Sequence, residues 1–227
     1  MMFVGHLGAG LAAKAVERRV NLGILFGAAM LLDIALWAFV LLGWEHAIIP
    51  ADFAQRHYLL FDFPLSHSLL AALIWSAAAA LFWAVLWDRR RFLSIAAIVV
   101  ALTALSHWVL DALVHEPELT LWGDTSPRIG FGLWDHQPGA LLLEGAIAAI
   151  GLALFLARTA MAAWRKIVIV ALTLLVAGLT YVGTTAATAP PNATAPAATS
   201  LAAIVVIVLL SAWADHARMP AQQRQAA

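Results

Sequence analysis

His107, Asp111 and His115 follow one another at a spacing of four residues, directly after the almost wholly apolar segment 92–105. This spacing keeps their side chains on one face of a helix. Ionisable groups in an apolar membrane segment are costly and usually face the interior of a helix bundle. Histidine and carboxylate side chains are ligands of zinc, so the pattern predicts a buried metal centre that includes His107 and Asp111. The alternative is a His–Asp hydrogen bond that only joins two helices.

Four other ionisable residues near or within apolar segments are further candidates for metal ligands. His67 stands at the start of one such segment, with Ser66 as the expected N-cap of its helix. Asp33 lies in the middle of another, where a buried, unpaired carboxylate must be protonated, paired or bound to a cation. His6 lies near the start of the chain, and Asp62 precedes His67 by five residues. The alternatives are interfacial positions for the two histidines and a solvated loop for Asp62.

Two more residues are candidates for proton transfer. His115 is expected at the end of its helix, and Glu144 lies about one turn inside a later apolar segment. Either side chain can act as a general base beside a metal centre. Glu144 can equally be an acid at the level of the lipid headgroups. The remaining histidines are expected in solvated loops or the tail, outside the site: His46, His57, His136 and His216.

The composition is that of an integral membrane protein. Of the 227 residues, 63% are hydrophobic and 11% are charged, and the mean hydropathy is +0.89. The formal net charge is zero, so no basic surface indicates nucleic acid as a partner. The chain has no cysteine, which excludes disulfides, thiolate zinc sites and cysteine-held iron–sulfur clusters. We expect one integral membrane domain over residues 1–227.

Apolar runs predict an all-α, polytopic transmembrane bundle with six to seven spans. A span needs about 20 apolar residues. The expected spans are residues 21–43, 68–87, 92–114, 139–157, 167–183 and a short sixth, 201–214. Residues 3–16 are too few for a confident span and can be a tilted span, a re-entrant segment or an interfacial helix.

Basic residues fall at every second connection and predict the orientation of the bundle. They lie in segments 18–19, 89–91, 158–166 and the tail with Arg218 and Arg224. The positive-inside rule places these segments in the cytoplasm and the loops 44–66, 116–138 and 184–200 outside. This topology brings His67, Asp111 and His115 to the outer half of the membrane. If residues 3–16 cross it, His6 reaches the same side.

These residues together resemble the motifs of the YdjM-like family of inner-membrane proteins, which are described as metal-dependent hydrolases. The resemblance covers about the first half of the chain. The matching motifs are Gly5-His6, the intramembrane Asp33, Pro64-x-Ser66-His67-Ser68 and Ser106-His107-x-x-x-Asp111. The resemblance implies a metal site held by the histidines and aspartates of these motifs.

The chain departs from that family at two positions. Asp62 stands where the family has the first histidine of a double-histidine motif, and Ile34 and Ala35 follow Asp33 where the family has a second aspartate. The resemblance thus implies one exchanged ligand, Asp62, and one missing ligand. Segments 115–121 and 130–135 resemble an uncharacterised branch of small bacterial membrane proteins.

The resulting hypothesis is a metal-dependent hydrolase of the inner (plasma) membrane with its site near the outer leaflet. Zinc is the expected ion, because histidine and carboxylate ligands suit it and no thiolate is present, with manganese as another divalent option. The expected partners are membrane lipids and a lipid or lipid-linked substrate. Nucleic acid is not an expected partner.

Two other functions use the same residues. In a proton- or metal-coupled transporter, Asp33, His107 and Asp111 would form a relay across the membrane. In a haem protein, His67 and His107 would be axial ligands on facing helices.

Overall fold

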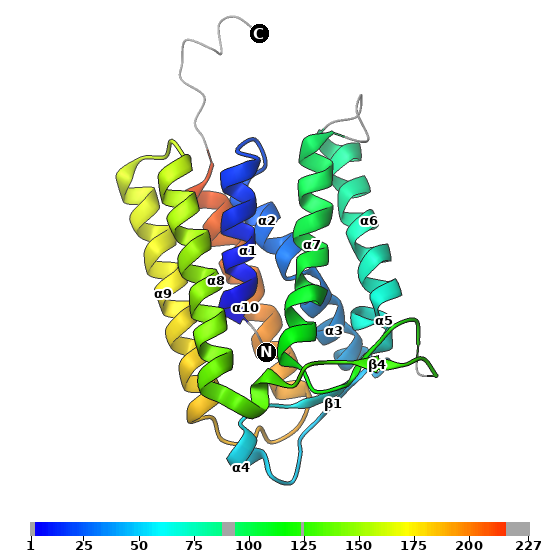
Figure 1. The fold of residues 1–227 in the computed structure, drawn as a ribbon. Helices are drawn as coiled ribbons and strands as arrows, with labels where there is room; N and C mark the ends of the chain where they lie inside the picture. Colours follow the sequence, from blue (N-terminus) through cyan, green and yellow to red (C-terminus); the bar gives the residue numbers. More distant parts are fainter. Residues whose placement is uncertain (1–2, 88–93, 124, 217–227) are drawn as a thin grey trace, which may run out of the picture.

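The computed structural model describes residues 3–87, 94–123 and 125–216, and this part of the chain is almost entirely helical (Figure 1). The helices are α1 (Phe3–Val16), α2 (Leu22–Ala29), α3 (Leu31–Leu42), α4 (Phe53–Arg56), α5 (Pro64–His67), α6 (Leu69–Trp87), α7 (Ile95–Val114), the 3-10 helix η1 (Leu133–His136), α8 (Gln137–Arg158), α9 (Ala163–Thr185) and α10 (Thr194–Ala214). The strands are β1 (His46–Ile48), β2 (Leu60–Asp62), β3 (Leu119–Thr120) and β4 (Arg128–Ile129).

Five helices are long and apolar enough to cross a membrane: α6, α7, α8 together with η1, α9 and α10. The pair α2 and α3 passes the same test only as a unit, and the two helices are bent by 57°. The chain is therefore an all-α, multi-pass membrane protein with five such helices in its described part, or six if the bent pair is one span. Helix α1 has only 14 residues and runs along one half of the bundle (Figure 1).

The predicted span 21–43 is interrupted at Met30, between α2 and α3. No glycine or proline causes this bend, since Ala29, Met30 and Leu31 occupy the junction. In a continuous helix the carbonyl oxygen of Ala29 would accept the N–H of Asp33. Here it accepts a hydrogen bond from His107 of α7 instead. A tertiary contact thus replaces a helical hydrogen bond at the bend.

The last helix is longer than the sequence predicts. It begins at Thr194, so that part of the expected loop 184–200 is helical and the short span 201–214 becomes a helix of 21 residues. Pro196 lies in the first turn, where a helix needs no N–H donor from that position. The side chain of Asn192 accepts a hydrogen bond from the N–H of Ala195 and stabilises this start.

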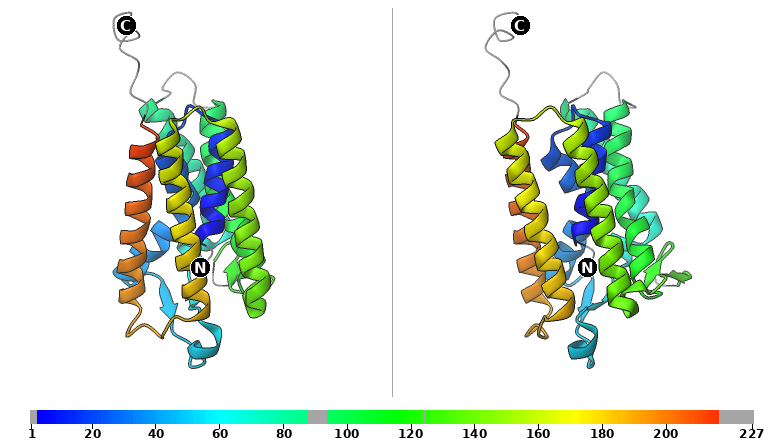
Figure 2. Two further views of the ribbon diagram at one scale, coloured as in Figure 1. Left: turned by 90° about the vertical axis from the view of Figure 1, so that its left-hand side faces the viewer. Right: turned by 60° about the vertical axis from the view of Figure 1, so that its left-hand side comes forward.

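Helix α1 lies inside the bundle, where it contacts α2, α7, α8 and α9 (Figure 2). Glycines make its close approach to α8 possible. A Cβ atom at Gly8 would lie 2.6 Å from the carbonyl oxygen of Ile147, and one at Gly151 would overlap the carbonyl of Gly8. Small residues at such a crossing let two membrane helices pack backbone to backbone. The contact with α8 is the most extensive that α1 makes, so α8 does most to position α1 and the side chains on it.

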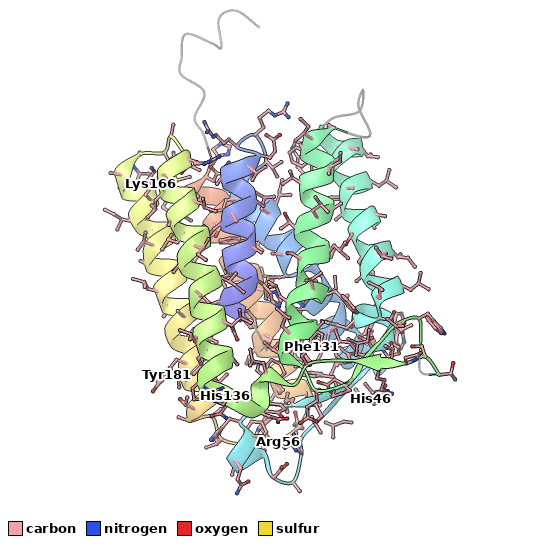
Figure 3. The ribbon with its side chains drawn as sticks, in the orientation of Figure 1. His46, Arg56, Phe131, His136, Lys166 and Tyr181 are labelled. Atoms are coloured by element: carbon pink, nitrogen blue, oxygen red, sulfur yellow. The ribbon has the colours of Figure 1, made fainter. Side chains whose placement is uncertain are left out.

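The two ends of the bundle differ in chemistry. The α1–α2 and α8–α9 turns lie at one end with Arg18, Arg19, Arg158 and Lys166, and we call it the basic end (Figures 1 and 3). The expected basic residues 89–91, 218 and 224 and the predicted span start at 92 lie outside the described residues.

The opposite end is covered by residues 44–63 and 116–136, which we call the cap. It contains the antiparallel pairs β1–β2 and β3–β4 together with α4 and η1. Figure 3 labels three residues at this end, His46, Arg56 and His136, and labels Lys166 at the basic end. In the cap the hydroxyl group of Tyr58 lies 2.8 Å from a carboxylate oxygen of Glu116 and 2.9 Å from one of Asp135. Burial and these carboxylates raise the pKa of Tyr58 above its ordinary value.

Candidate metal centre

Five predicted site residues lie together where α1, α3, α5 and α7 meet. We call them the His–Asp cluster, and each is at most 4% exposed: His6, Asp33, His67, His107 and Asp111. His6 lies in the first turns of α1 and Asp33 in the first turn of α3. His67 ends α5, and His107 and Asp111 lie in the half of α7 that leads to the cap. Residues up to 105 positions apart in sequence thus converge in the interior of the bundle.

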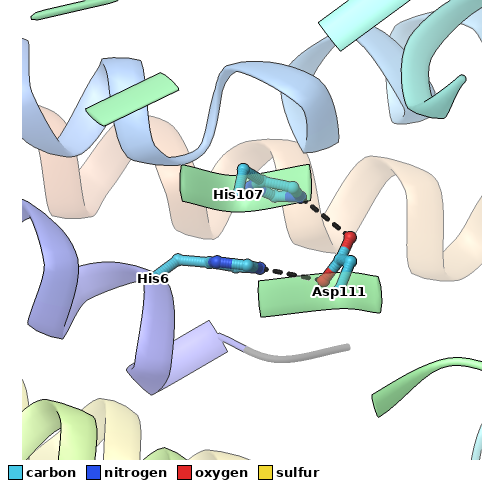
Figure 4. A group of neighbouring side chains, drawn as sticks. All are labelled: His6, His107 and Asp111. Carbon is cyan, nitrogen blue, oxygen red and sulfur yellow. Dashed lines mark hydrogen bonds and ion pairs between the residues drawn. The ribbon is translucent and has the colours of Figure 1, made fainter. Parts of the chain in front are cut away.

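Three of these side chains, those of His6, His107 and Asp111, meet at hydrogen-bond distances (Figure 4). One carboxylate oxygen of Asp111 lies 3.2 Å from Nε2 of His6, and the other lies 3.2 Å from Nε2 of His107. Nε2 of His67 lies 3.4 Å from Asp111 and 3.2 Å from Nε2 of His107. Asp33 is slightly farther away, with Oδ1 3.7 Å from Nε2 of His107 and 3.9 Å from Nε2 of His67.

These separations fit the donor set of one metal ion. With zinc–nitrogen and zinc–oxygen bonds of about 2.0–2.1 Å, two ligand atoms of a tetrahedral site lie about 3.3 Å apart. Two overlapping triads in the described residues have all their ligand atoms within 4.8 Å of one another: His6, His107 and Asp111, and Asp33, His67 and His107. His107 belongs to both, so it is the central ligand candidate.

The bend between α2 and α3 provides a hydrogen-bond partner for Nδ1 of His107, the ring nitrogen that points away from the cluster. This atom lies 2.7 Å from the carbonyl oxygen of Ala29. A carbonyl oxygen can only accept, so Nδ1 carries the hydrogen. Nε2 of a neutral His107 then has a lone pair that points into the cluster, which is the tautomer a metal ligand requires.

A chain of two groups fixes His67 in the same tautomer. Nδ1 of His67 lies 2.7 Å from Oγ of Ser66, and Oγ of Ser66 lies 2.6 Å from Oε2 of Glu45. Glu45 also accepts hydrogen bonds from the N–H groups of Leu65 and Ser66. Burial raises the pKa of Glu45, and these hydrogen bonds oppose that shift. With Ser66 donating to the carboxylate, His67 donates through Nδ1 and keeps a lone pair on Nε2.

His115 approaches the cluster from the cap. Its Nδ1 atom lies 2.6 Å from a carboxylate oxygen of Glu118, which therefore accepts the Nδ1 hydrogen. Its Nε2 atom lies 3.8 Å from Asp111. The other oxygen of Glu118 accepts a hydrogen bond from the N–H of Phe61. Glu118 thus joins the end of α7 to β2 and fixes the ring of His115.

Sequence reasoning missed Glu45, Ser66 as a partner of His67, and Glu118. Ser66 is not an N-cap: it lies inside α5, and Ser68 caps α6 by accepting from the N–H of Ala71. Glu118 follows His115 by three residues, and this spacing is the only signal in the sequence. Glu45 reaches the site through the tertiary fold and has no local signal.

Besides His115, two other predicted site residues lie outside the cluster. Asp62 is at the end of β2, opposite His46 in the hairpin, and its carboxylate lies 3.8 Å from Arg128. The strand directs it to the half-exposed face of the cap. Glu144 is buried in α8 and faces the backbone N–H groups of Val4 and Gly5. It therefore supports the start of α1, beside His6, and forms no ion pair with the cluster among the described residues.

The cluster has more hydrogen-bond acceptors than donors. The Nε2 lone pairs of His67 and His107 and the oxygens of Asp111 and Asp33 face one another in an interior closed to solvent. Such a set is stable only with a cation or added protons between the groups. A haem does not fit between His67 and His107. Its two axial nitrogens would lie about 4 Å apart, at twice a metal–nitrogen bond of about 2 Å, with the macrocycle between them. Nε2 of His67 and Nε2 of His107 lie only 3.2 Å apart.

The chain matches no protein-family model, no curated protein and no solved structure.

Proposed function

We propose that this protein is a metal-dependent hydrolase of the inner membrane, with the His–Asp cluster as its metal site. The observation that carries the proposal is the shared direction of the histidine lone pairs. Ala29 and Ser66 each take the Nδ1 hydrogen of one histidine, so that Nε2 of His107 and Nε2 of His67 face the carboxylates of the cluster. Zinc is the ion that this donor set suits best, and manganese is the next choice.

The proposed topology has the basic end in the cytoplasm, in line with the positive-inside rule. The bent pair α2–α3 would then be a sixth span, and the cap would face the outside. The cluster would lie in the outer half of the membrane, between the middle of the bilayer and the outer lipid headgroups. At that depth the accessible substrates are lipids or lipid-linked molecules.

A bound zinc ion would lower the pKa of a water molecule and polarise a phosphoryl or acyl oxygen. The role proposed for His115 is that of general base. A narrow gap without room for a water molecule lies between the cluster and the cap, and its lining includes Asp33, Phe61, Asp111 and His115. When water or substrate opens this gap, His115 would accept a proton through Nε2, and the carboxylate of Glu118 would stabilise the resulting imidazolium. Glu144 would act as a positioning residue through the first turn of α1.

One observation supports a transporter as the second candidate. The bend between α2 and α3 lies beside the cluster, and α1 is a half-length helix whose first turns carry His6. Broken helices near the middle of the membrane form the ion sites of many transporters. The same cluster would then bind its ion transiently, and Asp33 would be essential for movement of the ion.

Elemental analysis of the purified protein tests the proposed function. We expect about one or two equivalents of zinc or manganese in the wild type, and loss of that metal in His107→Ala and Asp111→Ala. His46→Ala, an exposed histidine of the cap, is the matched control and should keep the metal. Wild-type protein without metal after reconstitution with zinc would overturn the proposal. Ion flux into liposomes that Asp33→Asn abolishes would favour the transporter instead.

A further inference from the structure

A groove of about 500 Å³ lies between α9, α10 and the cap. On α10 its lining extends from Pro196 to Ile207, which is about 16 Å at a rise of 1.5 Å per residue. This length is about half of a hydrocarbon core about 30 Å thick, so the groove is about one leaflet deep. Most of the lining is apolar, and no Lys, Arg, Asp or Glu belongs to it in the described part of the chain.

Only a layer of aromatic side chains separates this groove from the His–Asp cluster. Phe3 precedes His6 by one turn of α1, and Trp37 follows Asp33 by one turn of α3. Both side chains line the groove, together with Phe61. Phe61 also lines the narrow gap at Asp33, His67 and Asp111. Phe61 thus lies between the groove and the cluster.

Two buried polar atoms belonging to residues of the groove lining have no hydrogen-bond partner among the described residues. They are Nε1 of Trp37, whose side chain is fully buried, and Oγ1 of Thr180. Buried polar groups in native proteins nearly always have a partner. The indole N–H is a donor only, so its missing partner is an acceptor such as an oxygen atom. Hydrocarbon alone would leave both groups unsatisfied.

We propose that this groove binds the hydrocarbon chain of a monoacyl lipid, whose ester carbonyl accepts the hydrogen of Trp37 Nε1. The absence of charged residues from the lining favours a neutral carbonyl over a phosphate at this point. The chain would enter between α9 and α10 from the outer leaflet, and the ester would lie one aromatic side chain away from the cluster. This inference rests on the proposed function, because it assigns the lipid as the substrate of the same metal site.

Two glycines of α9 provide a matched pair of variants. A Cβ atom at Gly183 or at Gly178 would have no neighbour within 4 Å. Gly183 lines the groove, whereas Gly178 is absent from its lining. Gly183→Trp should therefore fill the groove without strain inside the bundle. Gly178→Trp adds the same side chain to the same helix and leaves the groove open.

The test is photo-crosslinking of the whole chain in nanodiscs with a lysophosphatidylcholine that carries a diazirine in its acyl chain. We expect the label on α9 and α10 residues of the groove, a reduction of at least tenfold in Gly183→Trp and less than twofold in Gly178→Trp. Trp37→Phe should weaken competition by the unlabelled ester lipid several-fold. It should not affect competition by an ether-linked analogue without the carbonyl.

Equal labelling of the two glycine variants would overturn the groove as the lipid site. Labelling spread over α6 and over α10 residues outside the groove would do the same. Equal competition by ester and ether lipids in the wild type would overturn the role of Trp37. Zinc content, measured on the same samples, tests the hydrolase separately. Zinc without groove labelling overturns only the lipid site, and groove labelling without zinc overturns the assignment of the lipid as a substrate.

Discussion

The Nε2 atoms of His67 and His107 lie 3.2 Å apart, and in the neutral rings neither carries a hydrogen that can bridge them. Each ring has its hydrogen on Nδ1, where Ser66 or Ala29 accepts it. This arrangement therefore requires a cation or additional protons between the two rings and the carboxylates of the cluster.

Ser66→Ala should weaken metal binding by about 10–100-fold, the usual effect of removing a group that orients a metal-binding histidine. His67 would lose the acceptor for its Nδ1 hydrogen, while all five side chains of the cluster would remain. The measurement is a competition titration of zinc against a chelator. Ser76→Ala is the control, since Ser76 is also buried and its hydroxyl group donates to the carbonyl oxygen of Ala72 in its own helix. Equal affinities in the two variants would contradict the role of Ser66.

His115→Ala should lower kcat by about 10²–10⁴-fold, the usual contribution of a general base. Zinc content should not change, because His115 lies outside the His–Asp cluster. Glu118→Gln should lower kcat less, and the double variant should be no slower than His115→Ala, because Glu118 acts through His115. Hydrolysis of a monoacyl lipid, measured with Glu17→Gln at the basic end as control, gives these rates. An additive double variant would show that the two residues act independently.

Gly8→Leu should destabilise the protein by about 1–3 kcal/mol or more, because the added side chain overlaps the carbonyl of Ile147 and overpacks the α1–α8 crossing. His6 would move with α1, so zinc content should also fall. Thermal unfolding in detergent and elemental analysis measure the two effects. Gly145→Leu is the matched control on α8, because a Cβ at Gly145 meets nothing within 4 Å. Similar stabilities for the two variants would argue against a close crossing.

Tyr58 should titrate late in alkali, because burial raises its pKa and the carboxylates of Glu116 and Asp135 add to the shift. The pKa of a free tyrosine is about 10. A raised pKa in the folded state means that the contribution of Tyr58 to stability is present below that pH and is lost as the pH rises further. The chain has two tyrosines, so the absorbance of phenolate separates them. Tyr58→Phe should remove the later step, and loss of the earlier step instead would contradict the assignment.

Much of the cluster could be predicted from the sequence because polar residues are conspicuous in apolar helices. The spacing of His107 and Asp111 gives their shared face, and the alternation of basic loops places His67 at the same depth. The bend at Met30 could not be predicted, since the carbonyl group that it frees, that of Ala29, bonds to a residue 78 positions away. The same holds for Glu45, whose partner Ser66 is brought to it by the cap.

Asp62 and the start of α10 show two other limits of the pattern. Proximity to His67 in the sequence made Asp62 a candidate ligand, but the β1–β2 hairpin turns it toward Arg128. The proline, alanine and threonine residues before 201 resemble a loop. Pro196 is nevertheless compatible with a helix, because it falls in the first turn of α10. Whether a proline is compatible with a helix thus depends on its position relative to the helix start.

The close crossing of α1 and α8 has a consequence for the order of assembly during synthesis. Asp33, His67, His107 and Asp111 belong to the first 111 residues and can meet once α7 has entered the membrane. His6 emerges first from the ribosome, yet α1 is held in place by α8, which is made later. The earliest of these five residues to be translated should thus be the last to reach its final position, and uptake of the ion should follow insertion of α8.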